Sequence, residues 1–132
     1  MDTRPIHILL VEDDDVSRKL IHALLSPTRY ALTDARDLTR ARVELARRHP
    51  DAILLDVRLG DGNGLDLARE VRSQPRFAAV PILAITAQAL VGDAARAIEA
   101  GADAYLAKPI DTREFVALLD TLVRKHQGHA HG

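Results

Sequence analysis

Residues 51–67 have the sequence DAILLDVRLGDGNGLDL, in which a short apolar run ends in one acid and a glycine-rich loop follows. The run at residues 52–55 is apolar at every position, as expected for a strand that is buried on both faces of a sheet. Asp56 stands at the end of this strand. The glycines of the loop at residues 60–64 permit positive φ angles, and a helix of roughly residues 65–73 is expected to follow.

Similar apolar runs recur along the chain and alternate with segments of helical periodicity. This alternation is typical of a parallel sheet that is covered by helices on both faces. The expected strands are residues 6–11, 30–34, 52–55, 82–85 and 104–107, and the expected helices are about 16–24, 38–49, 65–73, 90–100 and 111–125. The sequence thus predicts an α/β protein with five strands and five helices.

The first helix is expected from four apolar residues at helical spacing. These are Val16, Leu20, Ala23 and Leu24, and Pro27 is expected to end the segment.

Other helix ends are also marked by residue type. Asp37 is expected to cap the second helix, Gly101 to end the fourth, and Asp111 to open the fifth in a sequence that resembles a capping box. Residues 127–132 lack apolar periodicity. We therefore expect a flexible tail after a single domain of residues 1–126.

The composition fits one globular domain and argues against several classes of protein. The chain has 132 residues, of which 47% are hydrophobic and 28% charged. Its formal net charge of −1 offers no basic excess for direct contact with nucleic acid. The absence of cysteine excludes disulfides and thiolate metal sites. No apolar stretch approaches the roughly 20 residues of a membrane span and no secretory signal opens the chain, so a cytoplasmic protein is expected.

Four of the expected strands lead into polar residues of different chemical kinds. These residues are Glu12 and Asp13, then Asp56, Thr86 and Lys108. Because parallel strands point the same way, their carboxyl ends share one edge of the sheet, where ligands bind. The acids would repel one another without a cation, and their oxygen atoms suit Mg²⁺. The sequence therefore predicts a magnesium site, with the lysine reaching in from a nearby strand.

Phosphoryl transfer is the chemistry that this set of groups favours. A carboxylate can act as the nucleophile when a metal and a lysine disperse charge on the transferring group, and Asp56 is the expected acceptor. The hydroxyl of Thr86 and backbone N–H groups near Ala87, at the start of the fourth helix, would hold the phosphoryl oxygens. Each residue alone has a simpler explanation, such as a helix cap or a turn.

The chain resembles the receiver domains of response regulators in bacterial two-component signalling over practically its whole length. The matching motifs are ILLVEDDD at 8–15, DAILLDVRLGDGNGLDL at 51–67, VPILAITA at 80–87 and GADAYLAKPI at 101–110. The resemblance is to the single-domain type, such as the chemotaxis and cell-cycle regulators. It implies a flavodoxin-like, doubly wound sheet with strand order 2-1-3-4-5.

The resemblance also implies a role for the acids. Asp56 would accept a phosphoryl group from a histidine kinase or a histidine phosphotransfer protein. Glu12, Asp13 and Asp56 would hold Mg²⁺, together with the backbone carbonyl of Arg58. The protein would catalyse only its own phosphorylation and dephosphorylation, and would not be a turnover enzyme.

Further implications concern the switch and the loop. Thr86 and Tyr105 would form a switch pair, in which the hydroxyl moves toward the phosphoryl oxygens and the ring turns inward. The fourth helix, fifth strand and fifth helix would then change their contacts with a downstream protein or in a homodimer. The Lys108–Pro109 bond would be cis. Gly60 departs from the proline that is usual in the family, so the loop is expected to be more mobile.

Other interpretations stay open at this point. The chain would also fit a receiver domain excised from a hybrid kinase or a larger regulator. A haloacid-dehalogenase-like phosphatase also uses an aspartate and Mg²⁺, but it carries a second acid where this chain has Arg58. A flavodoxin-like electron carrier would need a phosphate-binding loop after the first strand, where this chain is acidic. A receiver fold used only as an unphosphorylated binding module is the remaining alternative.

Overall fold

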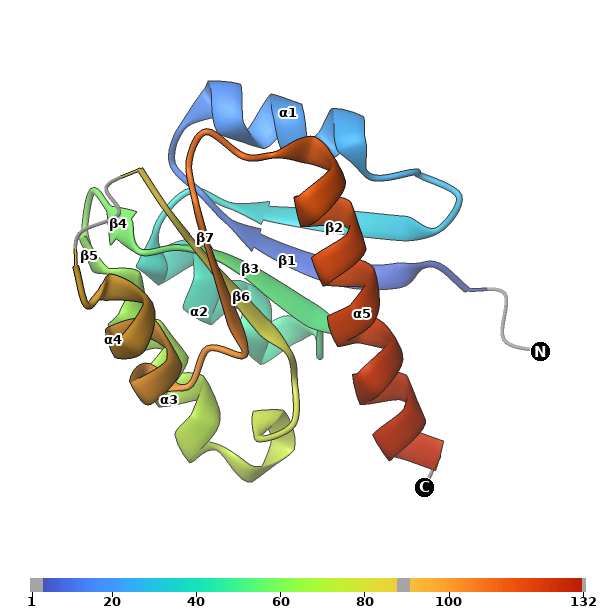
Figure 1. The fold of residues 1–132 in the computed structure, drawn as a ribbon. Helices are drawn as coiled ribbons and strands as arrows, with labels where there is room; N and C mark the ends of the chain where they lie inside the picture. The colour runs from blue at the N-terminus through green and yellow to red at the C-terminus, as the bar shows by residue number, and fades with distance from the viewer. Residues whose placement is uncertain (1–3, 88–90, 132) are drawn as a thin grey trace.

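A five-stranded parallel sheet forms the centre of the molecule in the computed structural model, which describes residues 4–87 and 91–131 (Figure 1). Its strands lie in the order β2-β1-β3-β6-β7, which confirms the predicted order 2-1-3-4-5. The strands are β1 (Ile6–Val11), β2 (Tyr30–Ala35), β3 (Ala52–Asp56), β6 (Ile82–Thr86) and β7 (Ala104–Ala107).

Four α-helices connect these strands and a fifth follows the last strand in the described part of the chain. They are α1 (Asp15–Leu24), α2 (Leu38–Arg47), α3 (Gly64–Ser73), α4 (Asp93–Ala100) and α5 (Thr112–His131). A hairpin of two short strands, β4 (Arg58–Leu59) and β5 (Gly62–Asn63), lies between β3 and α3, and a short 3₁₀ helix covers Pro75–Phe77. The sequence predicts neither of these small elements.

Two apolar layers enclose the sheet because successive side chains of each strand point to opposite faces. On one face, Ile8 and Leu10 of β1 pack with Ile21 of α1 and Phe115 of α5. On the other face the core contains residues of α2, α3 and α4. Figure 1 shows α5 in front of the sheet and α2 behind it. The arrangement leaves the carboxyl edge of the strands open between the layers.

All three predicted helix-end residues are present. The side chain of Asp37 accepts a hydrogen bond from the Arg40 N–H at 2.7 Å, and that of Asp111 accepts one from the Glu114 N–H at 2.9 Å. Gly101 ends α4 with a left-handed φ of 117°. These residues satisfy backbone groups that the helix itself leaves unpaired.

The apolar spacing in α1 correctly predicts a helix but not the face that is buried. Val16 is 74% exposed and Leu20 is 38% exposed, whereas Ile21 and Arg18 are buried. Ile21 packs against the sheet together with Leu25, one turn further on. Val16, Leu20 and Ala23 therefore lie on the solvent side of the helix, while Leu24 packs partly against the core.

Two other expectations about helix ends are wrong. The fourth helix begins at Asp93 rather than near Leu90, because Gly92 adopts a left-handed φ of 86° directly before it; residues 88–90 lie outside the described part of the chain. The fifth helix runs to His131, beyond residue 125, where the sequence pattern placed its end. Gly128 is the one residue of 127–131 with a strong intrinsic cost in a helix, and one such residue does not end it.

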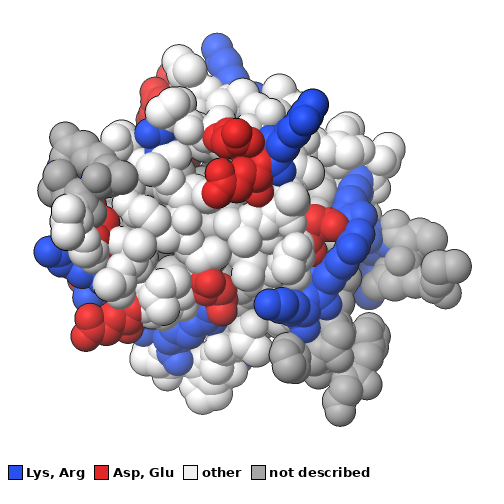
Figure 2. Space-filling model, in the orientation of Figure 1, with Lys and Arg blue, Asp and Glu red and all other residues white. Residues whose placement is uncertain are grey.

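The surface lacks a dominant charge on the face shown in Figure 2. Lys and Arg side chains there occur in small groups interspersed with Asp and Glu, without a continuous basic patch. Across residues 4–87 and 91–131, no helix is both long and apolar enough to cross a membrane.

Candidate phosphoacceptor and metal site

Three carboxylates meet at the carboxyl edge of the sheet. Glu12 and Asp13 follow β1, and Asp56 is the last residue of β3, the strand that pairs with β1. One carboxylate oxygen from each residue lies within 4.8 Å of the other two. Glu12 is 1% exposed and Asp56 is 5% exposed, while Asp13 lies at the surface. The structure thus brings together the three acids that the sequence placed at one edge.

Lys108 supplies the positive charge of the cluster. Its Nζ donates to both carboxylate oxygens of Glu12, at 3.0 and 3.1 Å, and to Oδ2 of Asp56 at 3.3 Å. The residue follows β7, and its backbone N–H donates to the Thr86 carbonyl at 2.7 Å. The next peptide bond, Lys108–Pro109, is cis, as the family resemblance implied.

The charges of this cluster shift the proton affinities of its members. Burial, together with the hydrogen bond and negative charge of Asp56, raises the pKa of Glu12 to about 7 against the opposing effect of Lys108. Burial disfavours the charge on Lys108, but hydrogen bonding to Glu12 and the charge of Asp56 raise its pKa above the ordinary value. The single positive charge of Lys108 therefore does not balance the charge of the three carboxylates. Their oxygen atoms fit a hard divalent cation.

Mg²⁺ binding is expected to tighten as the pH rises from about 6 to about 8. Below the Glu12 pKa of about 7, the ion must displace a proton from this carboxylate, which weakens its affinity by up to about tenfold per pH unit. Isothermal titration calorimetry at several pH values measures this dependence. An affinity that stays constant across the interval would contradict the assigned proton on Glu12.

In the absence of a divalent ion, the raised pKa of Glu12 makes the folded protein less stable as the pH rises. The pKa of Glu12 is about 7 in the folded protein and 4.5 ordinarily, so the folded state binds the proton more tightly. Stability in a chelating buffer should therefore fall as the pH rises from 4.5 to about 7. A Glu12→Gln variant cannot ionise at this position. Its melting temperature in thermal denaturation should therefore fall less over the same pH range.

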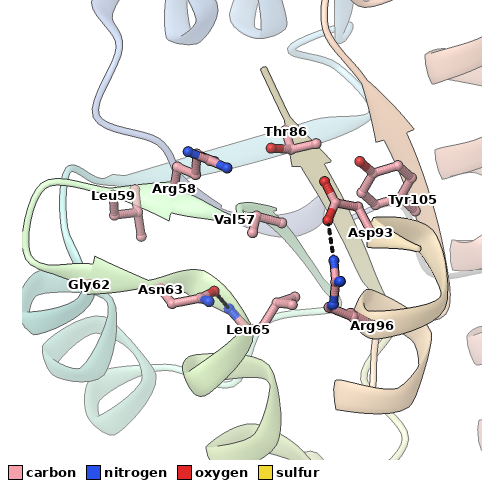
Figure 3. A pocket seen from close by; sticks show the side chains of 10 residues that line it. All are labelled: Val57, Arg58, Leu59, Gly62, Asn63, Leu65, Thr86, Asp93, Arg96 and Tyr105. Carbon is pink, nitrogen blue, oxygen red and sulfur yellow. Dashed lines mark hydrogen bonds and ion pairs between the residues drawn. The ribbon is translucent and has the colours of Figure 1, made fainter. Parts of the chain in front are cut away.

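Thr86 and Tyr105 line one pocket beside the acids. The pocket has a volume of about 460 Å³ and also includes Arg58 and Asp93 (Figure 3). Thr86 ends β6 and is 1% exposed. The Tyr105 hydroxyl is buried and has no hydrogen-bond partner among the described residues, and burial raises the pKa of Tyr105 above its ordinary value. The two proposed switch residues thus share one cavity between the sheet and α4.

Ala87 is placed differently by the structure than the sequence predicts. Ala87 is exposed and follows β6, but it precedes the first residue of α4, Asp93, by several positions. Its N–H group therefore does not belong to the start of that helix, contrary to the prediction. Arg58 opens the β4–β5 hairpin, and its backbone N–H donates to Oδ1 of Asp56 at 3.0 Å.

A buried arginine near the acids is absent from the sequence-based prediction. Arg18 of α1 is 8% exposed, and its Nη1 donates to the backbone carbonyl of Glu12 at 3.1 Å. It also pairs with Asp15 one turn earlier. An arginine beside acids on an amphipathic helix has the sequence pattern of an ordinary surface ion pair. Nothing in that pattern indicates that it fixes the strand end that carries Glu12.

The fold and the site define a class of protein, an open parallel α/β domain with an acidic cation site and a lysine at its carboxyl edge. Residues 8–120 match the family described as response regulator receiver domain. The chain belongs to this family. It is accordingly a phosphoacceptor domain of two-component signalling rather than a turnover enzyme.

Relatives include both short and long regulators. The polar-differentiation response regulator DivK of Brucella anthropi is 33% identical over 85% of this chain and 91% of its own length. The KDP operon transcriptional regulatory protein KdpE of Escherichia coli is 35% identical over 91% of this chain but only 52% of its own length. The chain thus spans about half the length of several curated relatives that it matches.

Solved structures show the same fold. The receiver domain of the sensor histidine kinase PA1611 from Pseudomonas aeruginosa is 38% identical, with a TM-score of 0.81 over 91% of this chain and 98% of that domain. That structure has a magnesium ion coordinated in its active-site cleft. The receiver domain of an HD domain-containing protein from Pseudomonas fluorescens is 29% identical, with a TM-score of 0.89 over 99% of this chain and 95% of that one.

Proposed function

We propose that Asp56 is the residue that accepts the phosphoryl group, from a histidine kinase or a histidine phosphotransfer protein in the cytoplasm. The observation that carries this proposal is the position of its buried carboxylate, which lies within reach of Glu12, Asp13 and Lys108. In the transfer, an oxygen of Asp56 forms a bond to phosphorus as the bond from phosphorus to the donor imidazole nitrogen breaks.

Mg²⁺ would be held by Glu12, Asp13 and Asp56, with the backbone carbonyl of Arg58 as a further ligand. The excess negative charge of the cluster and the raised pKa of Glu12 support this assignment. The bound ion would neutralise charge on the phosphoryl oxygens. Lys108 lies between two of the acids and would pair with a phosphoryl oxygen as well.

The response to phosphorylation would begin at Thr86, whose hydroxyl would donate to a phosphoryl oxygen, assisted by the N–H of Ala87. Tyr105 shares the pocket with Thr86, so a displacement of one side chain changes the space open to the other. The face of α4, β7 and α5 would then alter its affinity for a downstream protein or for a second copy of the chain. The shared pocket wall between Thr86, Tyr105 and Asp93 of α4 supports this direction of transmission.

Beryllofluoride, a phosphoryl mimic, provides a test in the presence of Mg²⁺. Its addition should shift the backbone amide resonances of Asp56, Thr86 and residues along α4, β7 and α5 in ¹H–¹⁵N spectra. Asp56→Asn should remove these shifts, because the amide lacks the anionic oxygen that the mimic binds. Identical shifts in the two proteins would disprove the assignment of Asp56.

A further inference from the structure

The loop after Asp56 is a hairpin that is fixed at its base. Arg58 pairs with Asn63 and Leu59 with Gly62, which leaves Gly60 and Asp61 at the tip. These short strands follow Asp56 directly, and the Arg58 N–H donates to its carboxylate. The position of the hairpin therefore sets the position of the Arg58 backbone beside the acidic cluster.

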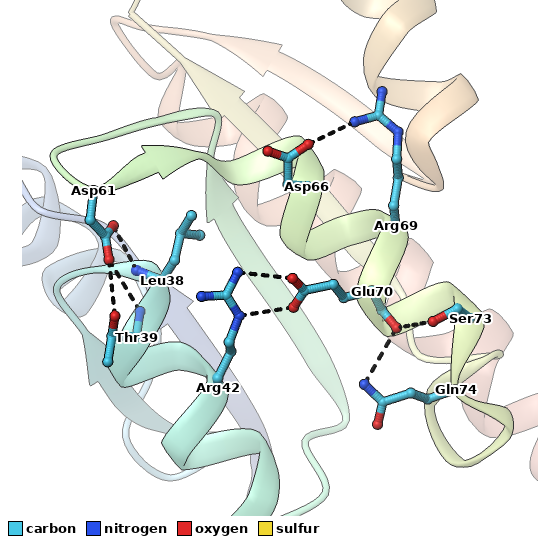
Figure 4. Close-up of polar contacts among 9 residues, drawn as sticks. All are labelled: Leu38, Thr39, Arg42, Asp61, Asp66, Arg69, Glu70, Ser73 and Gln74. Atoms are coloured by element: carbon cyan, nitrogen blue, oxygen red, sulfur yellow. Dashed lines mark hydrogen bonds and ion pairs between the residues drawn. The ribbon is translucent and has the colours of Figure 1, made fainter.

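The tip of this hairpin is bound to a different helix. Oδ1 of Asp61 accepts from the Leu38 N–H at 3.0 Å, and Oδ2 accepts from the N–H and the hydroxyl of Thr39, each at 3.3 Å (Figure 4). Leu38 and Thr39 are the first two residues of α2. The hydrogen bond to Leu38 is the main cause that lowers the pKa of Asp61, so the carboxylate is ionised at neutral pH.

The start of α2 can bind the carboxylate of Asp61 because its N-cap residue, Asp37, leaves two backbone N–H donors without an acceptor. Asp37 takes the N–H of Arg40, the third residue of the helix. The N–H groups of Leu38 and Thr39 remain, and an α-helix has no internal acceptors for them. The positive end of the helix dipole adds to the attraction for an anion.

The helix that holds the tip is itself held in place. Arg42 of α2 forms a bidentate pair with Glu70 of α3, with N–O distances of 2.9 and 2.8 Å (Figure 4). At the tip, a Cβ atom on Gly60 would lie 4.0 Å from Oδ2 of Asp13. The tip of the hairpin thus lies close to Asp13 and is also hydrogen-bonded to α2.

We propose that Asp61 is a positioning residue for the phosphoacceptor site. Its carboxylate fastens the hairpin to the start of α2 and thereby holds the Arg58 backbone in place beside Asp56. Gly60 lacks the ring of the proline that is usual in the family, so the sequence predicts a more mobile loop. The hydrogen bonds of Asp61 oppose this mobility. The inference rests on the proposed role of Arg58 as a metal ligand.

Asp61→Ala should weaken Mg²⁺ binding by on the order of tenfold. The effect is limited because Asp61 does not bind the ion itself and only orients the Arg58 backbone, which is the proposed ligand. Asp61→Asn keeps one acceptor oxygen, so its Mg²⁺ affinity should lie between those of Asp61→Ala and wild type. Calorimetric titration with Mg²⁺ measures the affinity, and circular dichroism on heating measures stability. The rate of labelling by acetyl phosphate at saturating Mg²⁺ should change much less than the affinity.

Asp37→Ala is the matched control, because it removes the other carboxylate from the same helix end without touching the hairpin. It should lower the melting temperature and leave the Mg²⁺ affinity near that of wild type. Equal Mg²⁺ affinity for Asp61→Ala and wild type, or equal weakening by Asp37→Ala, would overturn the inference. Failure of the wild-type protein itself to bind Mg²⁺ would instead overturn the proposed function.

Discussion

Replacing Lys108 with methionine is expected to slow phosphorylation by acetyl phosphate by on the order of 10²- to 10³-fold, the usual cost of removing one preorganised donor from a site where negative charge develops. The Nζ of Lys108 contacts both Glu12 and Asp56 within 3.3 Å. Methionine keeps the length and apolar character of the side chain but removes the charge. The rate is measured from the growth of the phosphorylated species by intact mass.

The loss of this charge also affects the protein without a phosphoryl donor. Glu12 and Asp56 would stay buried without their cation, which raises the pKa of Glu12 further and lowers stability above neutral pH. Lys19→Met is the matched control because Lys19 is exposed on α1. Equal labelling rates in the two variants would show that Lys108 has no part in the transfer.

A Gly64→Ala variant is expected to lose both stability and phosphorylation. A Cβ atom at this position would lie 2.2 Å from the carbonyl oxygen of Asp56 and 3.1 Å from its carbonyl carbon. Backbone atoms cannot rotate away as a side chain can, so the start of α3 must move from the end of β3. Overpacking of this kind costs about 1 to 3 kcal/mol. The displacement acts on the residue that is proposed to accept the phosphoryl group.

Gly60→Ala provides the comparison for this prediction. Its Cβ atom would meet nothing closer than Oδ2 of Asp13 at 4.0 Å. Urea denaturation should show a large loss of stability for Gly64→Ala and a small one for Gly60→Ala, and labelling by acetyl phosphate should show the same order for the rate of phosphorylation. Similar behaviour of the two would indicate that the contact between Gly64 and Asp56 is not tight in solution.

Much of the fold follows from local patterns, whereas the sheet order came from family resemblance. The runs at β1, β3 and β6 predict strands because each is long enough and mostly apolar. The hairpin of β4 and β5 was not predicted, because strands of two residues have no periodicity. The buried face of α1 was also missed, since its apolar residues lie on more than one side of the helix.

The main chemical groups of the site were predictable because they stand at strand ends. Parallel strands place Glu12, Asp56 and Lys108 at one edge whatever the details of the loops. Contacts made by loops and helices were not predictable. Asp61 is 22 and 23 positions from its partners on α2, and Arg18 reaches a carbonyl that carries no side-chain signature. Such contacts depend on the folded geometry.

The central claim is that Asp56 accepts the phosphoryl group with the help of Mg²⁺. Its most direct test is the intact mass of wild type and Asp56→Asn after incubation with acetyl phosphate, with and without Mg²⁺. Wild type should gain one phosphoryl group in the presence of Mg²⁺ and very little in a chelating buffer, and Asp56→Asn should gain none under either condition. Equal labelling of Asp56→Asn and wild type would contradict the account.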